Sequence, residues 1–224
     1  MDGDSRLRPA SEFTRPPSLW DRPKTRGLSE VEVLVYRSNL LGSDRSVTNF
    51  GGGNTSAKVR TRDPITGEPT DVLWVKASGG DLGSITAAGF ARLRLDRLRA
   101  LGKGYGGSAD EARIAGLYAH AAFEPASPAP SIDTPLHGLL PYAHIDHVHP
   151  DAVVALATSS KGPAAAREAF EGGVGWTEWL RPGFELALRL KALVEADPGL
   201  RGVVLEGHGL ISWGETAEAC YRNT

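Results

Sequence analysis

Three consecutive glycines interrupt this chain at positions 51–53, within the segment NFGGGNTSAK. Glycine loses more conformational freedom on folding than any other residue, so a run of three is too costly for the interior of a helix or a strand. We therefore predict a loop at this point whose backbone another group approaches closely. Two strand-like runs follow, at 57–62 and 71–78, and the turn-forming residues DPITGEPT between them predict a β-hairpin.

Helical and extended patterns are mixed along the rest of the chain. Apolar spacing and capping residues predict five helices. The first covers 30–41 with Ser29 as its N-cap, the second runs from Thr86 to Leu101, and the third begins at a capping box of Ser108 and Glu111 and ends at about His120. The fourth covers 183–197 (GFELALRLKALVEAD), and the fifth begins at Glu215 or Thr216. Runs of β-branched residues predict strands in DAVVALAT (151–158) and on both sides of a Gly-His-Gly turn in 202–213. Because helices and strands do not alternate regularly, we predict an α/β fold rather than a Rossmann fold, namely a three-layer α/β/α sandwich with a central, mainly antiparallel sheet.

Composition divides the chain into two parts. Residues 1–28 are rich in Arg, Pro, Ser and Asp and lack apolar periodicity, so we expect a flexible leader. Residues 29–224 are expected to form one domain. The helical pattern at the end of the sequence stops without a capping residue, so we expect this domain to be truncated at its C-terminus.

The charge balance excludes several classes of partner. The 224 residues carry 25 Lys and Arg against 27 Asp and Glu, a formal net charge of −2, without a long basic run, so neither nucleic acid nor an anionic membrane is an expected partner. No apolar stretch approaches the roughly 20 residues of a membrane helix and no signal peptide opens the chain, so we expect a cytoplasmic protein. Cys220 is the single cysteine, which leaves any metal to histidines and carboxylates.

Three histidines are candidate metal ligands. His147 and His149 lie two residues apart in an extended segment, where alternate side chains point to one face and two imidazoles can chelate one divalent ion. His208 lies between two glycines that leave its ring unobstructed. The alternative is that the first two are ordinary surface or core histidines and that His208 is a turn residue.

A carboxylate and two glycine loops are the other candidates for chemistry. Asp133 in PSIDTPLH is a candidate acid/base group, and its alternative role is an Asx turn or a helix cap; His137, four residues on, is expected to pack rather than to ligate. The loops GGGNTSAK and ASGGDLG offer free backbone N–H groups and small hydroxyls to a phosphate, although either could be a simple turn. Neither loop matches a Walker motif or a dinucleotide fingerprint.

Taken in order, the segments GGGNTSAK, KASGGDLG, PSIDTPLH, HVHP and EGHGLISWG resemble the class II aldolase/adducin family of zinc-dependent enzymes that act on sugar phosphates. Within it the sequence is most similar to the aldolase half of bifunctional rhamnulose-1-phosphate aldolase/short-chain dehydrogenases, through VLVYRSNL, DRSVTNFGGGNTS, RPGFEL and HGLISWGET. The resemblance covers roughly residues 30–224. It implies the α/β/α sandwich, a homotetramer with sites at subunit interfaces, and a dehydrogenase domain in full-length relatives that this sequence does not contain.

The resemblance also implies roles for individual residues. It implies Zn²⁺ bound by His147, His149 and His208, and Asp133 as the acid/base carboxylate. The implied neighbours of the substrate phosphate are Asn54, Thr55, Ser78, Gly79 and Ser131. The proton-donating tyrosine of the family matches no motif among the five tyrosines.

The implied activity is cleavage of L-rhamnulose 1-phosphate, or a similar ketose 1-phosphate, to dihydroxyacetone phosphate and L-lactaldehyde, as part of rhamnose catabolism. Aldolases of the family usually carry Glu where this chain has Asp133, whereas the related sugar-phosphate 4-epimerases carry Asp. A 4-epimerase therefore stays an alternative. A non-catalytic adducin-like scaffold is the other alternative, and such a protein is expected to lack the three histidines.

Overall fold

The computed structural model describes residues 18–49 and 52–224. Its strands are β1 (Asn54–Arg62), β2 (Pro69–Lys76), β3 (Phe90–Arg94), β4 (His144–Val148), β5 (Gly175–Thr177), β6 (Gly202–Leu205) and β7 (Gly209–Gly214). These described strands form one seven-stranded sheet in the order β3-β2-β1-β4-β7-β6-β5. Neighbouring strands are antiparallel except for the parallel pair β5 and β6, which confirms the predicted mainly antiparallel sheet.

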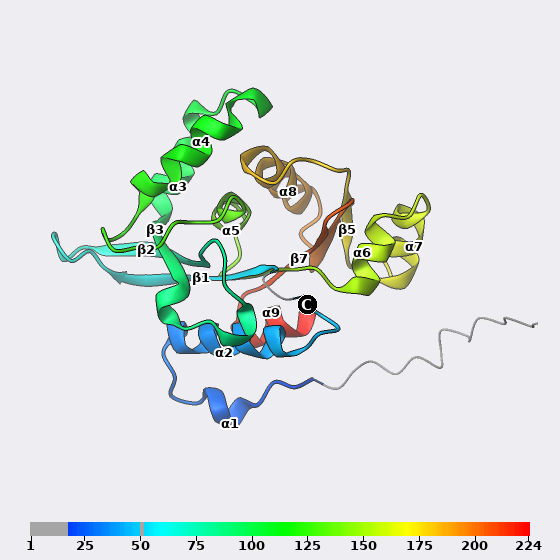
Figure 1. Ribbon diagram of the computed structural model, residues 1–224, viewed down its shortest axis with the longest axis horizontal. Coiled ribbons are helices and arrows are strands. Elements are labelled where there is room, and N and C mark those ends of the chain that lie inside the picture. The colour runs from blue at the N-terminus through cyan, green and yellow to red at the C-terminus, as the bar shows by residue number, and fades with distance from the viewer. Residues whose placement is uncertain (1–17, 50–51) are drawn as a thin grey trace, which may run out of the picture.

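Helices cover both faces of the sheet (Figure 1). The α-helices are α1 (Arg22–Thr25), α2 (Glu30–Ser43), α3 (Leu95–Ala100), α4 (Glu111–Leu117), α5 (Thr134–Leu139), α6 (Asp151–Ala157), α7 (Gly162–Ala169), α8 (Phe184–Ala196) and α9 (Ala217–Asn223). Short 3-10 turns are η2 (Leu82–Ser84), η3 (Ala87–Gly89), η4 (Leu101–Gly104), η5 (Ser108–Asp110) and η6 (Tyr118–Ala121). In Figure 1, α2 and α9 lie on one face and α3, α4, α5 and α8 on the other, which is the predicted three-layer α/β/α sandwich.

Apolar side chains fill the space between these layers. The largest cluster joins α5 and α8 to β4, β6 and β7 around Leu136, Ile145 and Leu190. On the opposite face, Leu34 of α2 packs on Ala57 of β1 and on Phe90. Both cores surround the middle strands β1 and β4, so polar side chains on these two strands are held in a dry and rigid setting.

Several predicted elements are confirmed. The hairpin forms as β1 and β2, the Gly-His-Gly turn joins β6 to β7, and the pattern over 183–197 forms α8. Ser29 caps α2 in a capping box with Glu32, and Thr216 caps α9 by accepting a hydrogen bond from the Ala219 N–H.

Two local predictions are wrong because tertiary packing outweighs local pattern. The helix expected from Thr86 to Leu101 is instead strand β3 followed by the short α3, since Phe90, Ala91 and Leu93 are buried where β3 pairs with β2. The strand expected in DAVVALAT is helix α6, which begins after Pro150 with Asp151 in its first turn, a position where an acidic residue favours a helix.

Glu111 corrects a third prediction. Instead of completing a capping box with Ser108, its buried carboxylate accepts hydrogen bonds from the backbone N–H groups of Phe184 and Glu185 and from the Tyr105 hydroxyl. It therefore caps the N-terminus of α8, which is far away in sequence.

The expected leader falls partly outside the described residues. Residues 1–17 lie outside them, as do Phe50 and Gly51 of the glycine loop. From residue 18 onward, Trp20 packs against Tyr36 of α2 and Tyr221 of α9. In the described part of the chain, no helix combines the length and apolar character needed to cross a bilayer.

Candidate metal centre

Three imidazole rings converge at the end of β4 and the turn between β6 and β7. The Nε2 atom of His147 lies 3.1 Å from that of His149 and 3.2 Å from that of His208. All three ligand atoms lie within 4.8 Å of one another. The structure thus brings together the three histidines that the sequence offered as candidate metal ligands.

A backbone hydrogen bond fixes both the orientation of the His147 ring and the ring nitrogen that carries its proton. Its side chain is fully buried, and its Nδ1 lies 2.9 Å from the carbonyl oxygen of Leu210. A carbonyl can only accept a hydrogen bond, so Nδ1 carries the proton and donates it. The Nε2 lone pair is consequently free and faces the other two rings, as in metal sites where a backbone carbonyl fixes the tautomer of a ligating histidine.

Glycines hold the second ring in place. A side-chain carbon at Gly52 would lie 2.9 Å from the His149 Nδ1, and one at Gly209 would lie 2.7 Å from the His149 Cδ2. A side-chain carbon at Gly53, whose φ is +73°, would lie 2.7 Å from the backbone oxygen of His147. The glycine loop predicted from the sequence is therefore approached closely by the histidine segment itself.

The donor set fits a zinc ion. Two nitrogens that ligate one zinc at about 2.0–2.1 Å in a tetrahedral arrangement lie about 3.3–3.4 Å apart, close to the two separations found here. Burial lowers the pKa of His147 to about 4, and burial also lowers the pKa of His149 and His208. The rings are then neutral at pH 7, which is the form that binds a metal.

Asp133 lies on the same side of the sheet as these rings. It precedes α5, but its carboxylate makes no capping hydrogen bond to that helix, which removes its alternative role as a helix cap. Instead Oδ2 accepts a hydrogen bond from the Asn54 amide at 3.1 Å, while the buried Oδ1 has no hydrogen-bond partner among the described residues. One carboxylate oxygen is therefore anchored and the other is buried and unpaired.

Strand register explains why Asp133 is near the rings. Asn54 of β1 is paired directly with His147 of β4, and directly opposed residues project to the same face of a sheet. Burial pushes the pKa of Asp133 upward, but the neighbouring His147 and the Asn54 hydrogen bond push it lower, so the carboxyl is held below its ordinary pKa. Asp133 is therefore ionised at neutral pH.

Three of the expected phosphate neighbours, Ser78, Gly79 and Ser131, lie on two segments that one bridge joins, here called the rim. An isolated antiparallel bridge pairs Ala77 with Pro130, and the Ser78 N–H donates to the Ala129 oxygen, so Ser78 lies opposite Ala129 and Ser131 lies on the Lys76 side of the bridge. The Ser131 hydroxyl lies 3.4 Å from the Asp133 Oδ2, so this rim adjoins the carboxylate.

The other two expected phosphate neighbours are placed differently. Asn54 is near Asp133, with its amide already engaged. Thr55 is not brought to the site: strand alternation turns it to the α2 face, where its hydroxyl lies 2.6 Å from that of Ser38.

Sequence reasoning missed two residues here. Lys76 at the end of β2 is buried, and its ammonium donates a hydrogen bond at 2.9 Å to the backbone oxygen of Gly79 in the loop at that rim. His137 was expected only to pack, yet both of its ring nitrogens are hydrogen-bonded to β1. Spacing from Asp133 was the only sequence signal for His137, because its partners lie about 80 positions earlier.

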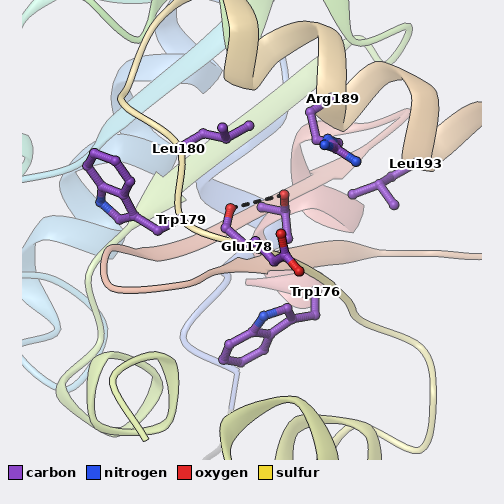
Figure 2. Close-up of a pocket in the computed structure, with 7 residues that line it drawn as sticks. Trp176, Glu178, Trp179, Leu180, Arg189 and Leu193 are labelled. Atoms are coloured by element: carbon purple, nitrogen blue, oxygen red, sulfur yellow. Dashed lines mark hydrogen bonds between the residues drawn. The ribbon is translucent and has the colours of Figure 1, made fainter. Parts of the chain in front are cut away.

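A separate cavity of about 300 Å³ lies between α8 and the segment that follows β5. Figure 2 shows Arg189 and Leu193 of α8 on one side of it and Trp179 projecting away from them. None of the three candidate metal-ligand histidines lines this cavity. Trp179 is 61% exposed, and a side-chain carbon at Gly207, next to His208, would lie 3.2 Å from its ring.

Comparison with known proteins gives concordant results. The family model for the class II aldolase and adducin N-terminal domain matches residues 32–224. YuxG, an uncharacterized oxidoreductase of Bacillus subtilis strain 168, is 41% identical over 207 residues, which cover 92% of this chain and 30% of YuxG. This chain therefore spans less than a third of the length of that relative.

Solved structures extend the comparison. The N-terminal class II aldolase domain of a conserved protein from Thermoplasma acidophilum is 32% identical, with a TM-score of 0.81 over 93% of this chain and 94% of that one. The L-fuculose-1-phosphate aldolase of Thermus thermophilus shares the fold at 16% identity, with a TM-score of 0.53 and 85% of each chain covered.

Proposed function

This chain belongs to the class II aldolase and adducin N-terminal domain family, and from that premise we propose that it is a zinc-dependent aldehyde-lyase. The substrate we propose is a ketose 1-phosphate, L-rhamnulose 1-phosphate in particular, cleaved to dihydroxyacetone phosphate and L-lactaldehyde. The observation that carries this proposal is the convergence of three Nε2 atoms beside a carboxylate with one free oxygen.

His147, His149 and His208 would hold the zinc ion. When bound, the ion would supply positive charge to the substrate oxygens on which negative charge develops as the carbon–carbon bond breaks. With three protein ligands, a bound ion would still be able to take up those oxygens. The Nδ1–H of His147 keeps its ring in the orientation that this requires.

Asp133 would move the proton. Cleavage takes one proton from the hydroxyl that becomes the aldehyde and returns one to the carbon that is left, so a single carboxylate can accept and return it. The free Oδ1 atom is the one available for this transfer, because Oδ2 is held by Asn54. A carboxylate that is ionised at neutral pH begins the cycle as a base.

The phosphate would bind at the rim formed by Ser78, Gly79 and Ser131. The two hydroxyls and the exposed backbone of the glycine loop can donate hydrogen bonds to an anion. The ammonium of Lys76 lies beneath this loop. Binding energy from the phosphate would hold the reacting carbons in place.

We further propose that residues 29–224 act as one domain of a homotetramer in the cytoplasm. In a longer protein such as YuxG, a second, oxidoreductase domain would accompany it.

A sugar-phosphate 4-epimerase is the second candidate, and a single observation favours it. The acid/base position is occupied by Asp133, as the resemblance implies for the epimerases, and Asp reaches about one methylene less far than Glu. The two reactions differ in their products. Dihydroxyacetone phosphate and an aldehyde indicate the lyase, whereas an isomeric sugar phosphate indicates the epimerase.

Hydrogen exchange of dihydroxyacetone phosphate tests the lyase without knowledge of the aldehyde. Zinc-loaded protein is incubated with this compound in D₂O, and loss of one carbon-bound proton is followed by NMR. We expect catalysed exchange in the wild type, a fall of about 10²–10⁴-fold in Asp133→Asn with zinc retained, and no change in Asp197→Asn, whose side chain is exposed at the end of α8. Wild-type exchange at the rate of buffer alone would contradict the lyase, and normal exchange in Asp133→Asn would remove Asp133 from the reaction.

A further inference from the structure

We propose that His137 is a positioning residue that fixes the Asn54 amide, and that Asn54 in turn anchors the Asp133 carboxylate through Oδ2 and leaves its Oδ1 unpaired. This role rests on the proposed function, because Asp133 is the group that it positions. It is carried by a buried chain of hydrogen bonds that links β1 to α5 and contains none of the three metal ligands.

The chain has three links. The Ser56 hydroxyl lies 2.8 Å from the Nδ1 of His137, and the Nε2 of His137 lies 2.9 Å from the Oδ1 of Asn54. The Nδ2 of Asn54 then donates to the Oδ2 of Asp133 at 3.1 Å. Ser56 and Asn54 both come from β1, while His137 and Asp133 flank the first turn of α5.

Each link determines the direction of the next. An ionised carboxylate can only accept, so Asn54 must turn its NH₂ group to Asp133 and its carbonyl oxygen to His137. That carbonyl oxygen can also only accept, so the Nε2 of His137 carries the proton. The Nδ1 of His137 is then an acceptor, and the Ser56 hydroxyl donates to it. One arrangement of protons satisfies the whole chain.

Burial makes this arrangement rigid. His137 is 0% exposed, Asn54 is 5% exposed, and Asp133 is 8% exposed, so water cannot easily replace a lost partner. Both ring nitrogens of His137 are already used, which leaves it no lone pair for a metal. Packing, the role predicted for His137 from the sequence, does not explain why a histidine is needed here. An apolar side chain of the same size would leave the Asn54 carbonyl oxygen without a donor.

Loss of His137 would therefore act through Asn54. Without the Nε2–H donor, the buried Asn54 carbonyl oxygen would have no donor, and the amide would have to shift to find one, which weakens its hold on Asp133. The carboxylate would then lose the hydrogen bond that anchors its Oδ2 and would shift from its present position. A misplacement of about 1 Å in a reacting group costs about 10²-fold in rate.

Two substitutions separate positioning from packing. His137→Leu removes both hydrogen bonds but fills the space, whereas His137→Gln keeps an N–H donor at similar reach for Asn54. In the dihydroxyacetone phosphate exchange assay we expect kcat to fall about 10²-fold in His137→Leu, with KM and zinc content unchanged. We expect His137→Gln to recover most of that loss, and His120→Gln, on the surface, to match the wild type.

The outcomes of this assay are distinct. A folded His137→Leu protein with wild-type kcat would overturn the proposal. Equal losses in the Leu and Gln variants would also overturn it, because packing alone would then account for the effect.

The tautomer of His137 is a test that requires no activity. Long-range ¹H–¹⁵N spectra of protein labelled with ¹⁵N-histidine report which ring nitrogen carries the proton, and His137→Gln identifies the signal. We expect the proton on Nε2 of His137, and a proton on Nδ1 alone would overturn the proposal. An inactive wild type in which His137 still carries its proton on Nε2 would contradict the lyase and leave the hydrogen-bond chain standing.

Discussion

Strands β1 and β4 carry buried polar groups on both of their faces, and the two faces use them in opposite ways. On the face covered by α2 and α9, here the closed face, the Asp146 carboxylate accepts hydrogen bonds from Arg37 at 3.0 Å, Cys220 at 3.1 Å and Thr224 at 3.3 Å. On the face toward α5, here the open face, the Nε2 atoms of the histidines face one another and the Oδ1 of Asp133 has no partner among the described residues.

The hydrogen-bond partners of a buried polar group, rather than its burial, distinguish the two faces. Asp146 and His147 are adjacent in β4 and both are fully buried, so exposure does not distinguish them. The groups around Asp146 are donors matched to an acceptor, which is what a stabilising network requires. The Nε2 atoms of three histidines instead crowd around one point, and that of His147 is an acceptor, an arrangement that suits a shared cation. The closed face should therefore determine stability, and the open face should determine metal binding.

The largest expected effect is on the closed face. Asp146→Ala leaves the Arg37 guanidinium buried without its counter-charge, and breaking one partner of a buried pair costs about 3–5 kcal/mol. We expect urea denaturation of the metal-free protein to show that loss, against almost none for Glu68→Ala, whose side chain is exposed. A loss below about 1 kcal/mol would mean that the closed face is not what stabilises the sheet.

His144 of β4 makes the free energy of unfolding depend on pH. Burial first, and then Arg37 and Lys58, lower the pKa of His144 to about 3, whereas in the unfolded chain its pKa is about 6.5. Between these values the unfolded chain binds more protons, so the free energy of unfolding falls as the pH drops below about 6.5. The contribution of this one group is at most about 1.4 kcal/mol per pH unit.

Unfolding of the wild type and of His144→Leu at pH 7, 6 and 5 measures that contribution. We expect a shallower pH dependence in the variant. Identical slopes would show that His144 is protonated as easily in the folded protein as in the unfolded chain.

Cys220 gives the smallest expected effect. Its thiol is fully buried and donates to the Asp146 Oδ2, and burial first, followed by the charge of Asp146, raises its pKa. Cys220→Ser keeps a donor, so we expect a change in unfolding free energy within about 1 kcal/mol, with a larger loss in Cys220→Ala. Equal losses in both variants would mean that the volume of the sulfur, rather than its hydrogen bond, matters on the closed face.

Sequence patterns predicted the parts of the fold that are determined locally. The hairpin of β1 and β2, the turn around His208 and helix α8 each follow from turn residues or apolar spacing within one segment. The three histidines could be proposed as ligands because their types and flanking glycines are readable in the sequence. Their convergence depends on the pairing of β4 with β7, which a sequence pattern does not give.

The predictions that failed depend on partners remote in sequence. The residues of β3 have a helical apolar pattern, but they form a strand because they pair with the edge of β2. Glu111 caps α8 rather than its own helix, 73 residues away from Phe184. Likewise, the hydrogen bonds that join His137 to β1 depend on how α5 packs on the sheet. In each case a tertiary contact outweighs the local signal.

The metal content of the purified chain tests the open face most directly. We expect about one zinc ion per wild-type chain, by elemental analysis, and none in a His147→Ala variant that remains folded by circular dichroism. Zinc would then depend on the open face while folding does not. A folded wild type that binds no zinc when it is supplied, or a His147→Ala variant with wild-type zinc content, would contradict the assignment of His147, His149 and His208 as a metal centre.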